Sequence, residues 1–126
     1  MKRLIFIMSF VLFALLTACT RQVGWVGMNY GNTFNATYMH FDGKQKETIQ
    51  ISAGDTFSLD YDVEIEEGVL TLQMLNPDRD VIWEATFLQD NSDEFSFTSE
   101  ESGRYTLNVL GDETQGGFDL EWNIAE

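Results

Sequence analysis

The side chains that could do chemistry are few in type and strongly unbalanced in charge. The 126-residue chain has one histidine (His40), one cysteine (Cys19) and 21 acidic residues. Ser-His-Asp triads, Cys-His pairs and zinc sites need further partners of these types, and the chain has no glycine-rich phosphate-binding motif. The number of acidic residues leaves one catalytic arrangement possible, a pair of carboxylates like that of a glycosidase. A domain this small offers such a pair little cleft, so we expect no enzyme and interpret His40 as structural.

Two loops carry carboxylates that could hold calcium. Ca²⁺ takes about six to eight oxygen ligands, and such oxygens occur at Asp78 with Asp80 and at Asp90 with Asp93. Neither loop matches an EF-hand, and Asp favours turns without any ion. Calcium at these four residues is therefore a hypothesis beside ordinary turn chemistry, and we expect no other cofactor.

The densest row of carboxylates is Asp60, Asp62 and Glu64. Alternate residues of a strand share one face and lie about 7 Å apart. Repulsion along the row would be relieved by Lys44, Lys46 or Arg79 on a neighbouring strand, or by a cationic partner. A solvated edge strand protected against unwanted pairing is the alternative.

The N-terminal residues predict where in the cell the protein is located. Lys2 and Arg3 precede an apolar run over 4–16 that is shorter than the about 20 residues a membrane-spanning helix needs. The run ends in small residues, as cleaved secretory signals do. Leu16-Thr17-Ala18-Cys19 resembles the bacterial lipobox. This resemblance implies cleavage between Ala18 and Cys19 and a diacylglyceryl group on Cys19.

The net charge of the mature chain limits the kinds of partner that it can bind. Five basic residues against 21 acidic ones give residues 19–126 a net charge of −16. Such a field repels nucleic acid, so we exclude nucleic-acid binding, and it favours cationic partners. With Cys19 used for lipid, no thiol remains for a disulfide, so packing alone must hold the fold.

Elements with period two must position these residues. The clearest is 56–65, where Phe57, Leu59 and Tyr61 alternate with polar residues, as a strand with one buried face requires. Residues 20–35, rich in Gly and Asn, predict a flexible tether on which Trp25 and Tyr30 are unusual. Strands are expected at 36–41, 45–52, 56–65, 68–75, 81–88, 94–98, 104–110 and 117–124, and tight connections at 42–43, 53–55, 67–68, 76–80, 102–103 and 111–117. Eight short strands at this spacing indicate an antiparallel β-sandwich of the jelly-roll type.

A second resemblance rests on the C-terminal strands. The segment Ser102-Gly103-Arg104-Tyr105-Thr106-Leu107-Asn108-Val109, followed by Gly117-Phe118-Asp119-Leu120, resembles the closing hairpin of bacterial pre-peptidase C-terminal modules. The resemblance implies a jelly-roll fold in an appended, non-catalytic binding domain.

Together these patterns predict a signal peptide (1–18), a lipidated N-terminus and tether (19–35) and one β-sandwich domain (36–126). We expect a monomeric, non-enzymatic lipoprotein on the extracytoplasmic side of a bacterial membrane, which binds a glycan, a wall polymer or a protein. One alternative is an inhibitor of a cationic envelope enzyme such as lysozyme. Another is an accessory subunit that docks on a membrane complex through the apolar strands 69–75 and 81–83.

Overall fold

The computed structural model describes residues 20–126, and this part of the chain consists of β-strands and their connections. The strands are β1 (Arg21–Val23), β2 (Val26–Tyr30), β3 (Thr33–Ile51), β4 (Thr56–Leu75), β5 (Val81–Phe87), β6 (Asn91–Thr98) and β7 (Gly103–Ala125). The all-β prediction is confirmed. Cys19 and the predicted signal peptide lie outside the described residues, and within 20–126 no helix has the length and hydropathy to cross a membrane.

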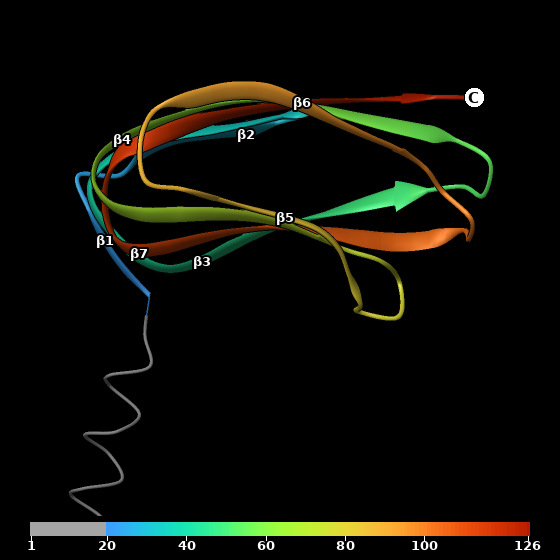
Figure 1. The fold of residues 1–126 in the computed structure, drawn as a ribbon, viewed down its shortest axis with the longest axis horizontal. Helices are drawn as coiled ribbons and strands as arrows, with labels where there is room; N and C mark the ends of the chain where they lie inside the picture. Colours follow the sequence, from blue (N-terminus) through green and yellow to red (C-terminus); the bar gives the residue numbers. More distant parts are fainter. Residues whose placement is uncertain (1–19) are drawn as a thin grey trace, which may run out of the picture.

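The seven strands form one antiparallel sheet that folds back on itself into two layers (Figure 1). The strand order is β1-β3-β7-β4-β5, with β2 also paired to β3 and β6 also paired to β4. The first layer contains β2, β6 and the segments 33–38, 117–125 and 56–65 of the three long strands. The second layer contains β5 and the segments 43–51, 103–111 and 69–75. The expected β-sandwich is therefore built from strands that run through both layers.

Three connections predicted from glycines are bends within long strands. The pairing of β3 shifts register between Tyr38 and Gly43, and that of β4 between Ile65 and Val69. β7 runs without a break through 111–117. The prediction of separate strands on either side of these points is wrong, because a bulge and a turn use the same glycine-rich sequence.

Gly68 shows why a bend needs glycine. Its φ angle of 78° lies in the left-handed region, which other residues reach at a cost. A Cβ atom at Gly68 would also overlap the carbonyl oxygen of Glu113 on β7. Only a residue without a side chain lets the two strands bend together here.

The connection between β4 and β5 is the tight turn that the sequence predicts. The Arg79 amide donates to the Asn76 carbonyl oxygen at 2.9 Å, and the Asp80 amide donates to the Asn76 side-chain oxygen at 2.9 Å. Asn76 therefore closes the turn by itself, and the predicted hairpin is confirmed.

Residues 20–35 are wrongly predicted to be a tether, because 21–30 contains two strands of the sheet. β1 pairs with 40–42 and β2 pairs with 33–37 of β3. Trp25, between them, stacks on Tyr38 with ring centroids 5.5 Å apart and also contacts Phe41 and Phe118. The segment is therefore part of the folded domain.

The core lies between the two layers and is rich in aromatic rings. Its most completely buried large side chains are Phe41, Ile51, Phe57, Leu59, Val63, Leu70, Leu72, Met74, Leu107, Val109 and Leu120. Because inward residues alternate with outward ones, the polar residues between them are left on the two outer faces. The outer face of the first layer carries the densest charge.

Candidate functional site

The outer face of the first layer gathers six exposed carboxylates on three adjacent strands. They are Asp60, Asp62 and Glu64 of β4, Glu94 of β6, and Asp119 and Glu121 of β7, and we call this surface the acidic face. The register places Asp62 opposite Asp119, and Asp60 opposite both Glu121 and Glu94. Directly opposed side chains of an antiparallel sheet have Cβ atoms about 4.5–5.5 Å apart. Like charges therefore stand side by side across the centre of the layer.

Little on this surface offsets the repulsion. The Ser92 hydroxyl donates a hydrogen bond of 2.9 Å to Asp62. The residues that line the two hollows of the face, described below, include no lysine, arginine or histidine. Lys44 and Lys46, which the sequence suggested as neighbours of the carboxylate row, pair instead with Leu110 and Asn108 in the second layer. The two lysines do not flank the row, because β7 and β6, not β3, flank β4 in the first layer, and Arg79 lies in the turn between β4 and β5.

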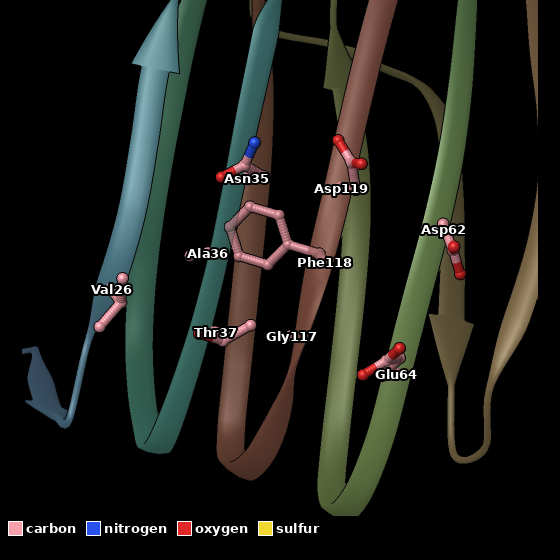
Figure 2. Close-up of a pocket in the computed structure, with 9 residues that line it drawn as sticks. All are labelled: Val26, Asn35, Ala36, Thr37, Asp62, Glu64, Gly117, Phe118 and Asp119. Carbon is pink, nitrogen blue, oxygen red and sulfur yellow. The ribbon is translucent and has the colours of Figure 1, made fainter.

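One hollow of the acidic face lies over Gly117 and is shown in Figure 2. Its volume is about 380 Å³, and Val26 and Thr37 border it on one side and Asp62 and Glu64 on the other. It exists because Gly117, opposite both Thr37 and Glu64 in register, has no side chain to fill the space. The hollow therefore combines an apolar wall with an acidic one.

A second hollow of about 480 Å³ adjoins the first along β4 and β6. It is lined by Asp60, Tyr61, Asp62, Ser92, Asp93, Glu94, Asp119 and Glu121. Both hollows are open and share Asp62 and Asp119. This broad, shallow surface suits a docked partner better than an enclosed small molecule.

A third hollow, of about 330 Å³, opens at the edge where β5 and β6 face each other. Phe95 and Phe97 of β6 line it together with Tyr105 of β7. The Phe95 ring stacks on Trp83 at 4.4 Å and lies 5.7 Å from Phe97. These rings are partly buried against the core rather than displayed in a row on a sheet face.

The predicted calcium residues are distributed over different parts of the sandwich. Asp78 and Asp80 lie in the β4–β5 turn near Glu101, and desolvation, followed by repulsion from Asp78, raises the pKa of Glu101. Asp90 accepts a hydrogen bond of 2.8 Å from the Ile65 amide at the bend of β4, and Asp93 accepts one from the Glu94 amide. Within residues 20–126, no group of three or more His, Cys, Asp or Glu residues is arranged to hold a metal ion.

The apolar strands considered for docking are mostly accounted for by the fold. Leu70, Leu72 and Met74 point into the core, whereas Thr71 and Gln73 face outward and hydrogen-bond to Thr86 and Glu84 of β5. Among the described residues of β5, only the large apolar side chains of Val81 and Ile82 are exposed.

The sequence predicts the outward direction of most carboxylates of the acidic face but not their assembly into one surface. The row on β4 and the outward parity of Asp119 and Glu121 follow from alternation alone. That β7 lies beside β4, and that their acidic residues are in register, depends on long-range pairing that one sequence does not encode locally. Gly117 is the boundary between the predicted connection 111–117 and the predicted strand 117–124, so the sequence does not reveal the hollow above it.

Comparison with known proteins supports the fold. No family model matches the chain, and no curated protein matches its sequence. A CBM4 structure superimposes with a TM-score of 0.52 at 12% identity, over 84% of this chain and 77% of that one. The pre-peptidase C-terminal domain of collagenase from Bacillus anthracis matches with a TM-score of 0.50 at 17% identity, over 78% and 91%.

The resemblance to pre-peptidase C-terminal modules is thus confirmed at the level of fold. The enzymatically active domain of tailspike protein 4 from bacteriophage CBA120 also matches, with a TM-score of 0.50 at 11% identity, over 83% of this chain and 18% of that one. Since the fold occurs in an enzymatically active domain as well as in binding modules, the function has to be argued from the site.

Proposed function

We propose that the protein is a non-enzymatic, lipid-anchored envelope protein that binds a cationic protein on its acidic face. The observation that carries the proposal is the register of β4, β6 and β7, which opposes Asp60 to Glu94 and Glu121, and Asp62 to Asp119. Directly opposed like charges destabilise a sheet. A basic partner would turn this cost into binding energy, because its charges would satisfy several carboxylates at once.

The other features of the chain are consistent with binding rather than catalysis. His40 lies at the bend of β3, opposite Val23, and away from the acidic face. The carbohydrate-binding modules among structural neighbours share the fold. The hollows of the acidic face lack the exposed aromatic row that sugar rings stack on, since the aromatic side chains that line them, Phe118 and Tyr61, are buried. A basic protein therefore suits this surface better than a neutral glycan.

Binding of the whole lipidated protein to a basic lysozyme tests the proposal. The double variant Asp62→Asn and Asp119→Asn removes one opposed pair, and it should weaken binding roughly 5- to 30-fold, at about 0.5–1 kcal/mol per exposed charge. Binding by the wild type should also weaken as salt rises, because the charges are exposed.

The matched control removes the same charge elsewhere. Glu66 and Glu126 are exposed and lie outside both hollows, so Glu66→Gln with Glu126→Gln should leave the affinity nearly unchanged. An equal loss in both double variants would reduce the effect to net charge and refute a specific face. Tight, salt-independent binding of a neutral oligosaccharide would favour the glycan alternative instead.

A further inference from the structure

The folded domain begins almost at the predicted lipid attachment site. β1 starts at Arg21, so only Thr20 separates Cys19 from a strand paired with β3. Two residues of extended chain span about 7 Å. If Cys19 carries lipid, as the proposed function holds, no tether lifts the domain off the bilayer.

Exposed apolar side chains concentrate on the same edge of the sandwich. Of the eight large apolar residues that are exposed in the described part of the chain, five lie within 23–39, namely Val23, Val26, Met28, Tyr30 and Met39. Val26, Met28 and Tyr30 alternate along β2 and are 59–80% exposed. Tyrosine side chains favour the membrane–water interface, and an exposed apolar cluster on an edge strand indicates a surface that is covered in the working protein.

Basic residues are also enriched in this part of the sequence, with Lys44 and Lys46 in the second layer next to the bend of β3 and β2 in the first. Residues 21–47 contain Arg21, Lys44 and Lys46 against two acidic residues, whereas 48–126 contain two basic and 19 acidic residues. Both acidic residues of the edge are engaged, since Asp42 accepts a hydrogen bond from the Glu113 amide and Glu47 accepts one from Asn29. The edge is thus the part of a strongly acidic domain that anionic lipid headgroups would attract.

From these observations we infer that the edge formed by β1, β2 and the adjoining part of β3, residues 21–47, rests on an anionic phospholipid bilayer. The inference depends on the proposed function for the anchor and adds the orientation of the domain. Strands are spaced about 4.8 Å apart, so with β2 on the membrane β4 stands three strands away, at about 14 Å. The carboxylates of β4 and β6 then lie farthest from the bilayer and stay open to a partner, whereas Val26, which borders the hollow over Gly117, lies next to the membrane.

Fluorophores attached at single cysteines test the orientation. Once Cys19 is lipidated, a cysteine introduced at Met28 or Tyr30 is the only free thiol, and Val81→Cys is the matched control. Val81 is also an exposed apolar residue, but it lies on β5 at the opposite edge of the sheet. The full lipidated protein is reconstituted in vesicles of phosphatidylglycerol and phosphatidylethanolamine, with or without spin-labelled quencher lipid.

Labels at 28 and 30 should shift to the blue and be quenched severalfold more than the label at 81. Equal responses at all three positions would overturn the inference. The mass of the N-terminal peptide reports separately whether Cys19 carries lipid. If it does not, Cys19 is itself a free thiol, so the same three cysteines are placed in a Cys19→Ser chain. Added vesicles that then shift only the labels at 28 and 30 would support the edge and refute the anchor, and an absence of any shift would refute both.

Discussion

Asp62 and Asp119 face each other at the centre of the first layer, where a sheet selected for stability alone would place opposite charges or Thr pairs. The second layer has such pairs at equivalent positions, for example Thr71 with Thr86, whose hydroxyl oxygens are 3.1 Å apart. Gln73 likewise donates to Glu84 at 3.0 Å. The first layer has comparable pairs toward one end of β4, Thr56 with Thr98 and Ser58 with Ser96, so its opposed like charges are confined to the segment 60–64 and its neighbours.

Glu101 predicts a pH effect at the scale of one residue. Desolvation and the nearby Asp78 raise its pKa in the folded state. Because the folded protein then holds the proton more tightly than the unfolded chain, the contribution to stability is present at acid pH and is lost as pH rises through the folded-state pKa. Glu101→Gln, which stays uncharged, should raise the melting temperature at pH 7.

The gain from Glu101→Gln should disappear below about pH 4, where the carboxyl is protonated in both states. Thermal unfolding at pH 3.5 and at pH 7 measures this difference, with Glu126→Gln as an exposed control. A gain of equal size at both pH values, or a loss at pH 7, would contradict the electrostatic explanation.

At the scale of elements, the bends of β3, β4 and β7 create the sandwich. The backbone pairing of β4 is interrupted at Ile65, and there the Ile65 amide donates a hydrogen bond to the Asp90 side chain. The bend therefore does not leave this backbone N–H group without a partner, which would be energetically costly. Asp90, which the sequence suggests as a calcium ligand, thus has a structural role at the bend of β4.

Gly68→Ala should destabilise the protein strongly. A left-handed backbone costs about 1–2 kcal/mol for a residue with a side chain, and overlap with the Glu113 carbonyl adds about 1–3 kcal/mol. The free energy of unfolding in urea should fall by about 3 kcal/mol. Gly31→Ala is the control, because Gly31 has a φ angle of 58° but no atom within 4 Å of a Cβ, so it should lose only about 1–2 kcal/mol. Equal losses would show that crowding at the bend is unimportant.

The elements also show what one sequence can predict. The inward residues of β4 and β7 can be predicted because apolar and polar residues alternate along a strand with one buried face. The hairpin can be predicted because Pro77 and the polar residues of 76–80 favour a turn. The sequence predicts turns around Gly43, Gly68 and Gly116, where the structure has bends within long strands, because glycine supplies the positive φ angles of bulges and turns alike. The sequence does not predict β2, because its inward positions hold Gly27 and Asn29 instead of apolar residues. The pairing of β2 with β3 depends on the tertiary fold.

At the scale of the whole molecule, the exposed N-terminal strands are joined to the core through the partly buried Trp25. Removing residues 20–32 takes away β1, β2 and Trp25, whose ring packs on Tyr38, Phe41 and Phe118. The fragment 33–126 should therefore be less stable than 20–126 by at least about 3 kcal/mol, the lower end of the cost of deleting a packed tryptophan. Urea unfolding of both proteins measures the difference, and Trp25→Ala in the longer chain should account for much of it. Equal stability of the two fragments would instead support the interpretation of residues 20–35 as a flexible tether.

The strand order also sets when the domain can fold. β7, the last strand in the sequence, lies between β3 and β4 and pairs with both along almost their whole lengths. Until those 23 residues emerge, β3 and β4 lack their common neighbour and neither layer can close. A chain delivered N-terminus first through a translocation channel would therefore stay unfolded until its end is released, and the sandwich would then close in a late, non-local and comparatively slow step.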